Sequence, residues 1–134
     1  MTEENRGKNA AEQIGRADVC LHEAEVLRRA GLPYGSASRA YYAVFHAACA
    51  LLLSKGLEPS THRGVVSLIG EHFVKTGALS ADLGRMVSRM QRDREDADYQ
   101  VGSVFTDEQA DEAVRSAERF IEAVRQMIAP AAAE

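Results

Sequence analysis

One arginine stands where the pattern of its segment calls for an apolar residue. Leu83, Val87 and Met90 follow one face of a predicted helix, and at about 100° per residue position 94 returns to within roughly 20° of Leu83. The residue there is Arg94. A guanidinium on a core face needs a partner or a ligand, because an unpaired buried charge is costly. Two interpretations stay open: an ion pair with Asp98 at the rim of the fold, or an anion site in which Arg94 binds a phosphate.

Other basic side chains could support such an anion site. Arg85, Arg89 and Arg92 lie at i, i+4 and i+7 on a face away from the apolar stripe. They form a basic ridge, which is either solvated surface or a track for nucleic-acid phosphates. His62 and Arg63 begin the preceding predicted helix, where they are either ordinary polar residues of a helix start or further donors beside the anion. The histidine at position 46 of an apolar helix is either a hydrogen-bonded core residue or a ligand.

The sequence carries none of the short motifs that indicate a metal or nucleotide-cofactor enzyme. It has no glycine-rich phosphate loop, HExxH, CxxC or GxSxG motif. The four histidines are scattered without the spacing of metal ligands. Cys20 and Cys49 lie within apolar helical patterns, which predicts buried, reduced thiols. We therefore expect no metal, no cofactor and a cytoplasmic location.

Length and charge narrow the class of protein. The 134 residues, with a formal net charge of −4, suit one soluble domain. No apolar run reaches the roughly 18 residues of a membrane span, and the polar N-terminus does not have the pattern of a secretory signal. The acidic balance argues against a surface coated in positive charge for nucleic acid. It leaves room for a local basic patch.

Turn signals divide the chain into five predicted helices, at about residues 9–30, 35–55, 60–77, 80–98 and 106–128. No segment alternates with period two, so we expect no sheet. Short connections favour antiparallel neighbours and a single up-and-down all-α bundle over residues 9–129, between a polar tail at 1–8 and a short tail at 130–134. The second helix is apolar on all sides except for the tips of Tyr41, Tyr42 and His46, which predicts that it is the central helix.

Four blocks of sequence carry a resemblance to a known family. They are SRAYYAVFHAA at 38–48, LLLSKG at 51–56, THRGV at 61–65 and REDADY at 94–99. In this order and register the chain resembles the HEPN family over roughly residues 14 to 128. These are small prokaryotic helical domains, often encoded beside a minimal nucleotidyltransferase. The resemblance implies an up-and-down helical bundle that forms a homodimer.

The resemblance also implies a site. Many HEPN proteins are metal-independent ribonucleases in which an arginine, followed after four to six residues by a histidine, lies at a dimer cleft. Arg94 matches the arginine, which would bind the scissile phosphate and stabilise its developing charge. Tyr99 occupies the slot of the histidine, and no histidine follows Arg94 anywhere in the chain. Asp98 and Tyr99 would assist Arg94 in the cleft. The supporting candidates for phosphate or nucleotide binding are Arg39, His62 and Arg63.

Two hypotheses of function follow. The first is a HEPN toxin-like module that acts on RNA, as a possible metal-independent endoribonuclease. The second is a non-catalytic module that binds a nucleotide or docks a minimal nucleotidyltransferase. In some paired systems of the family the transferase adds AMP to a tyrosine of the HEPN motif, and Tyr99 matches that position. The alternative for Tyr99 is packing at the end of the bundle. On a continuing helix it lies about 140° from Arg94, so either the helix ends first or the two residues meet across a dimer.

Overall fold

The structure of the protein, a computed structural model, describes residues 2–99 and 105–128, with the backbone alone for residues 96–99. The described residues form helices and no strand, which confirms the all-α prediction. None of these helices is long and apolar enough to cross a membrane. The elements are α1 (Glu3–Arg29), α2 (Pro33–Ser54), α3 (His62–Ile69), the π-helical turn η1 (Gly70–Val74), α4 (Ala81–Tyr99) and α5 (Asp107–Ile128).

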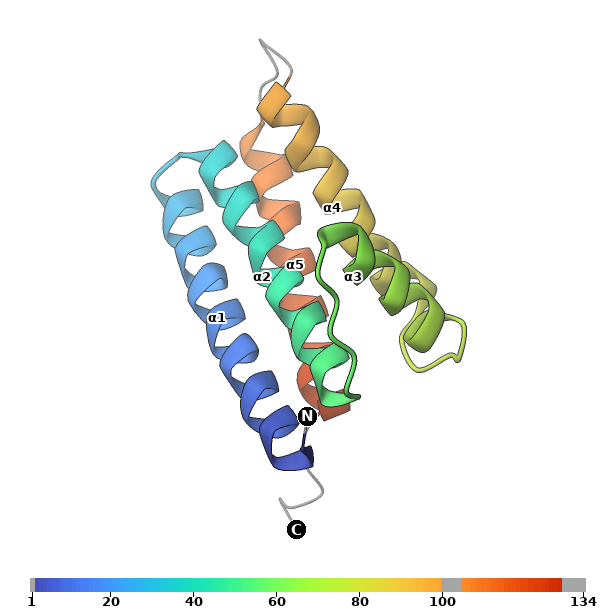
Figure 1. Ribbon diagram of the computed structural model, residues 1–134. Helices are drawn as coiled ribbons and strands as arrows, with labels where there is room; N and C mark the ends of the chain where they lie inside the picture. Colours follow the sequence, from blue (N-terminus) through green and yellow to red (C-terminus); the bar gives the residue numbers. More distant parts are fainter. Residues whose placement is uncertain (1, 100–104, 129–134) are drawn as a thin grey trace.

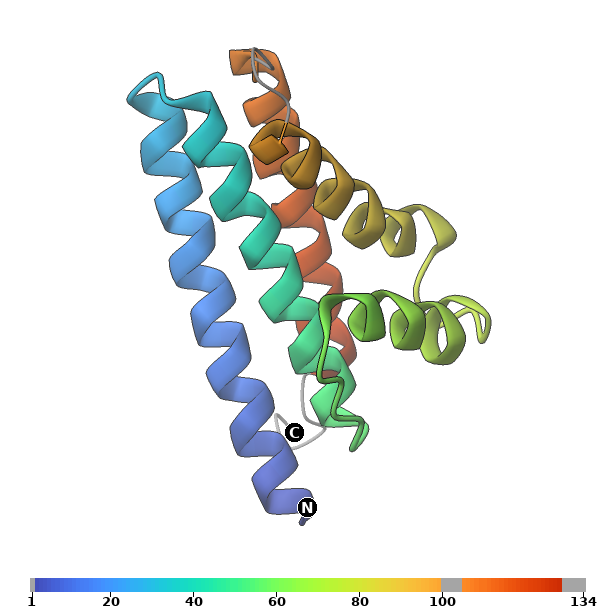
Figure 2. The same cartoon turned by 45° about the horizontal axis from the view of Figure 1, so that its top comes forward.

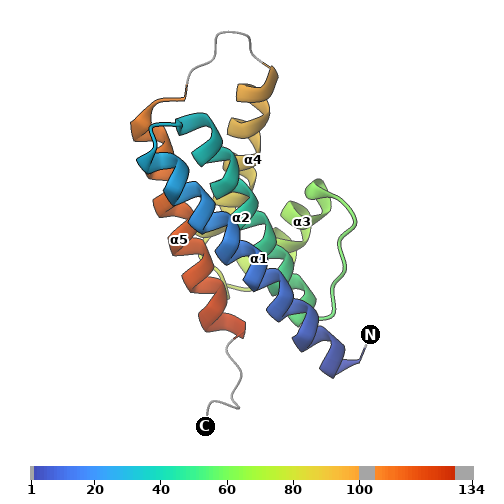
Figure 3. The ribbon, with the colours of Figure 1, turned by 90° about the vertical axis from the view of Figure 1, so that its left-hand side faces the viewer.

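Helix α2 is the centre of the molecule, as its sequence predicts. It contacts all four other α-helices. Helices α1 and α5 pack on one side of it, and α3 and α4 lie on the other side (Figures 1 and 3). Figure 2 shows that α3, with η1, and α4 run at an angle to the other three helices. Side chains of α1, α2, α3 and α4 can therefore meet on the face of α2 that lies between α1 and the α3–α4 pair.

Small residues allow α1 and α2 to pack closely. Alanines recur every seventh residue on α1, at Ala10, Ala17 and Ala24, and all three are buried. Because i and i+7 positions lie on the same helical face, this stripe offers α2 a surface without bulky side chains. The buried hydroxyl of Ser36 on α2 donates a hydrogen bond of 2.7 Å to the carbonyl oxygen of Ala24. The two long helices are thereby joined by packing and by a buried polar contact.

Capping side chains determine where the helices begin. The hydroxyl of Thr61 accepts from the Gly64 amide at 2.9 Å, and the hydroxyl of Ser80 accepts from the Leu83 amide at 3.2 Å. These caps confirm the predicted starts of α3 and α4. The predicted start of the first helix at residue 9 is wrong. Thr2 accepts from the amide of the residue three positions on, so α1 begins at Glu3, and its acidic first turn suits the helix dipole.

The third predicted helix also differs from expectation. The sequence predicts a single α-helix to about residue 77, but α3 gives way to the π-helical turn η1. This turn is closed by a 3.0 Å hydrogen bond from the Lys75 amide to the Gly70 carbonyl. The buried residues Val65, Ile69 and Phe73 are four positions apart, a spacing that drifts by about 40° per step on an α-helix. The wider π turn brings Phe73 back toward the core.

Candidate functional site

Arg94 lies against two tyrosines of the central helix. Its guanidinium carbon is 5.1 Å from the ring centroid of Tyr41 and 5.4 Å from that of Tyr42. Arg94 is half-buried, as expected for a charge on the core stripe. A guanidinium over an aromatic face is attracted by the ring quadrupole, more strongly when water is excluded. The partner of Arg94 is thus a pair of aromatic rings on α2, which could not be predicted from the apolar stripe of α4.

A second guanidinium shares the ring of Tyr42. Arg39, one turn earlier on α2, places its guanidinium carbon 5.0 Å from the Tyr42 centroid. It also forms an ion pair of 3.6 Å with Glu23 of α1. Two cations from α2 and α4 are therefore neighbours around one aromatic side chain. This arrangement concentrates positive charge locally on a chain whose total charge is negative.

His62, the first residue of α3, belongs to the same cluster. Its Nδ1 atom lies 2.5 Å from the hydroxyl oxygen of Tyr41. Its ring stacks on Phe45, with centroids 4.2 Å apart and an interplanar angle of 22°. The Thr61 cap fixes the start of α3 and so positions His62 over α2. The sequence singled out His62 but not its partner, although a phenol on an apolar helix is itself a signal, since a buried hydroxyl needs a hydrogen bond.

Burial controls the ionisation of this tyrosine. Tyr41 is 1% exposed. Burial raises the pKa of its phenol to about 12, and the nearby positive charge of Arg94 opposes part of that rise. Desolvation dominates because removing a phenolate from water costs more free energy than its attraction to the Arg94 guanidinium supplies. Tyr41 is therefore a neutral phenol that can donate a hydrogen bond at physiological pH.

His46 is a hydrogen-bonded residue of the helix interface. Its Nδ1 atom lies 2.8 Å from the side-chain oxygen of Gln13 on α1. Burial lowers the pKa of His46, and the positive charges of Arg16 and Arg39, together with His62, lower it further. This contact favours the core interpretation of His46 over the ligand interpretation.

The remaining predicted site residues stand apart from the cluster. Arg63 is exposed at the start of α3. The side chains of Asp98 and Tyr99 lie outside the described residues, so their roles stay predictions. Helix α4 continues through Tyr99, which rules out the alternative that the helix ends first. Its backbone places positions 94 and 99 about 140° apart.

The outer face of α4 carries the basic ridge. Arg85, Arg89 and Arg92 are all exposed. Arg85 pairs with Asp82, three residues earlier, at 3.9 Å. The ridge is therefore solvent-facing, on a side of α4 different from that of Arg94. Its use as a phosphate track stays a prediction.

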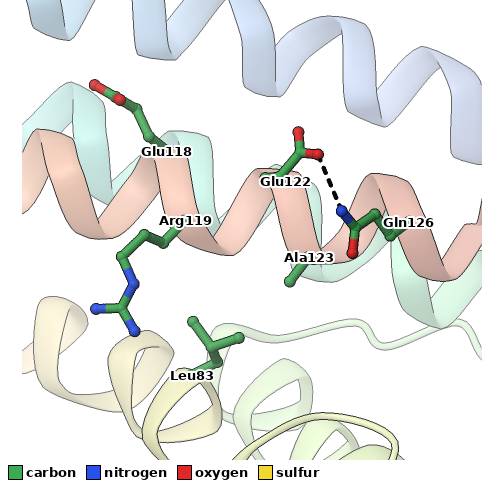
Figure 4. A pocket seen from close by; sticks show the side chains of 6 residues that line it. All are labelled: Leu83, Glu118, Arg119, Glu122, Ala123 and Gln126. Carbon is green, nitrogen blue, oxygen red and sulfur yellow. Dashed lines mark hydrogen bonds between the residues drawn. The ribbon is translucent and has the colours of Figure 1, made fainter.

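A hollow of about 550 Å³ opens between α4 and α5. Figure 4 shows Leu83 of α4 facing side chains of α5 across it. Arg119 forms an ion pair with Asp82 of α4, with an Nη2–Oδ2 distance of 3.3 Å. The predicted site residues do not line this hollow. Within residues 2–95 and 105–128, whose side chains are described, no three His, Cys, Asp or Glu residues gather as metal ligands would.

These features define an all-α bundle with a cluster of arginine, histidine and tyrosine on its central helix. The family model described as HEPN domain matches residues 10–127. The chain belongs to the HEPN family. A UPF0332 protein of Thermotoga maritima is 37% identical, over 84% of this chain and 86% of its own. A Methanocaldococcus jannaschii protein named "Putative toxin MJ0605" is 35% identical, over 84% of this chain and 83% of its own. A UPF0332 protein of Archaeoglobus fulgidus is 32% identical, and the match covers 87% of this chain and 92% of that protein.

Proposed function

We propose that this HEPN protein is a toxin-like module that acts on RNA, with Arg94 binding a backbone phosphate. The observation that carries the proposal is the position of Arg94 over Tyr41 and Tyr42, beside Arg39 and His62. Two relatives from Methanocaldococcus jannaschii, named "Putative toxin MJ0605" and "Putative toxin MJ0142", support the toxin part of the proposal.

The chemistry of the cluster suits a single strand of nucleic acid. Guanidinium groups bind phosphates in a fork geometry and compete well with water. Aromatic rings beside cations are typical of surfaces on which unpaired bases stack. With a net charge of −4, whole-molecule attraction cannot carry the binding, so the local cluster must do so. A homodimer would double this cluster at a shared cleft, as the family pattern implies.

The proposal is tested by comparing Arg94→Ala with Arg29→Ala. Both variants remove one guanidinium, but Arg29 is exposed at the end of α1, outside the cluster and the basic ridge, and serves as the control. Binding to a fluorescent single-stranded RNA is measured by anisotropy at fixed salt. A lost charge-assisted contact of about 1.5–3 kcal/mol corresponds to a loss of affinity of roughly tenfold or more. We expect this loss in Arg94→Ala and less than about twofold in Arg29→Ala.

The outcomes separate the possibilities. Equal affinity of wild type and Arg94→Ala would refute the phosphate role of Arg94. Incubation with total RNA and tRNA then decides whether binding leads to cleavage. Equal cleavage by wild type and Arg94→Ala would exclude Arg94 as the catalytic group. Absence of cleavage in both would remove the nuclease activity and leave RNA binding.

A second candidate function rests on the missing histidine. No histidine follows Arg94 in the sequence, and Tyr99 stands in its slot. We propose as the alternative that the protein docks a minimal nucleotidyltransferase and accepts AMP on Tyr99. Intact-mass measurement after incubation with the transferase and ATP tests this, with Tyr99→Phe as the variant and Tyr34→Phe, an exposed tyrosine, as the control. A gain of one AMP that persists in Tyr99→Phe would exclude that site.

A further inference from the structure

The buried hydroxyl of Tyr41 requires an acceptor. Tyr41 is 1% exposed, and a buried donor without a partner is costly because it has lost its hydrogen bond to water. Among the described residues, the hydrogen-bond partner of this hydroxyl is Nδ1 of His62, 2.5 Å away. Burial also keeps the phenol protonated, by raising its pKa to about 12. The phenol is therefore the donor and the imidazole Nδ1 the acceptor.

This direction of the bond decides the tautomer of His62. A neutral imidazole carries one proton, and a ring nitrogen that accepts a hydrogen bond does not hold it. The proton is then on Nε2, at the opposite edge of the ring. Stacking on Phe45 at 4.2 Å and the short bond to Tyr41 together restrict the orientation of the ring.

The Nε2 atom of His62 is available to a ligand. Within the described parts of the chain it has no hydrogen-bond partner, and His62 as a residue is partly exposed. The guanidinium carbon of Arg94 and the centre of the His62 ring lie 5.1 and 6.0 Å from the centroid of the Tyr41 ring. Tyr41 thus holds two donors, from α3 and α4, beside the same ring.

We infer that Tyr41 is a positioning residue that fixes His62 as its Nε2–H tautomer, so that neutral His62 and Arg94 together donate hydrogen bonds to one RNA phosphate. This inference rests on the proposed RNA function and adds a second donor to it. A preorganised neutral donor stabilises negative charge without bringing a third positive charge beside Arg39 and Arg94. In this state His62 is a hydrogen-bond donor and not a proton acceptor.

The tautomer is tested directly by NMR, without RNA. A long-range ¹H–¹⁵N spectrum of protein labelled at histidine shows which ring nitrogen carries the proton. His62→Gln assigns the signals of His62 by their loss. We expect Nε2–H in the wild type and a mixture of tautomers in Tyr41→Phe, which keeps the ring under Arg94 but removes the hydroxyl. A wild-type ring protonated on Nδ1, or on both nitrogens, would overturn the inference.

The role in binding is tested with the same single-stranded RNA. We expect affinity to fall about three- to tenfold in His62→Ala and in Tyr41→Phe, the loss of roughly one hydrogen bond. His62→Gln should retain most of the affinity, because its carboxamide accepts from Tyr41 with oxygen and donates with nitrogen. His72→Gln, at an exposed histidine, is the matched control and should bind as wild type does.

The two proposals can fail separately. Weak binding by Arg94→Ala with normal binding by His62→Ala and Tyr41→Phe would refute the inference and leave the RNA function standing. Weak binding by His62→Gln, equal to that of His62→Ala, would also refute the inference. It would show that a neutral hydrogen-bond donor at position 62 is not sufficient to bind the phosphate. Normal binding by Arg94→Ala would refute the phosphate role of Arg94 and with it the shared phosphate, whatever tautomer the NMR spectrum shows. Absence of RNA binding by the wild type would refute the RNA function itself. Circular dichroism of each variant shows that a loss of affinity is not a loss of fold.

Discussion

Gly84 of α4 lies against Val74 of the π-helical turn. A Cβ atom added at position 84 would lie 2.4 Å from Cγ2 of Val74. Real Cβ atoms essentially never approach another heavy atom so closely, so Gly84→Ala must displace the valine or shift α4. Because α4 carries Arg94, such a shift would also disturb the cluster on α2.

The magnitude follows from two opposing terms. Alanine in place of glycine within a helix stabilises it by about 1 kcal/mol. Overpacking a well-filled contact costs about 1–3 kcal/mol. We therefore expect Gly84→Ala to lower the free energy of unfolding by up to about 2 kcal/mol. In a Val74→Ala background the nearest remaining side-chain atom is the Cβ at 3.7 Å, an ordinary contact, so the same substitution should be stabilising by about 1 kcal/mol.

The assay is urea denaturation of the four proteins of this double-mutant cycle, followed by circular dichroism. The coupling free energy between positions 84 and 74 should be about 1–3 kcal/mol. Gly15→Ala on α1, where an added Cβ meets nothing within 4 Å, is the control and should stabilise by about 0.5–1 kcal/mol. An equal effect of Gly84→Ala in both backgrounds would refute the steric reasoning.

Three other predictions concern a cap and two ionisable side chains. Thr106→Ala should lower the free energy of unfolding by about 1 kcal/mol. The reason is that the Thr106 hydroxyl accepts from the Gln109 amide while the Gln109 side chain accepts from the Thr106 amide. An unchanged urea midpoint would contradict this prediction. The pKa of His46 is lowered in the folded state, so the unfolded chain binds more protons and stability should fall as the pH drops below about 6.5. His46→Gln should reduce that fall in thermal melts, and an identical fall in both proteins would count against His46 as its source. The pKa of Tyr41 is raised to about 12, so its contribution to stability is present below about pH 10 and is lost as the pH rises toward 12. Tyr41→Phe should reduce this loss of stability at alkaline pH. A loss as steep as that of the wild type would contradict Tyr41 as its source.

Most helix positions could be predicted from the sequence, because their causes are local. Thr61, Ser80 and Thr106 cap helices that begin close to the predicted starts at about residues 60, 80 and 106. The uninterrupted apolar pattern of α2 predicted its central place. The early start of α1 was missed, since a polar first turn carries no periodic signal and its cap is a single hydroxyl at Thr2. The π turn was missed because residue spacing alone does not report a local widening of the helix.

For the site, the sequence alone determined which residue breaks the pattern of its helix: Arg94 follows an apolar stripe, and that is readable from a 3.6-residue period. Only the tertiary structure decided what it meets. Arg94 lies over Tyr41 and Tyr42, and Tyr41 binds His62 across a separation of 21 residues. These contacts depend on how α2, α3 and α4 are rotated and crossed against one another. That geometry is set by the packing of the whole core, which a local pattern does not contain.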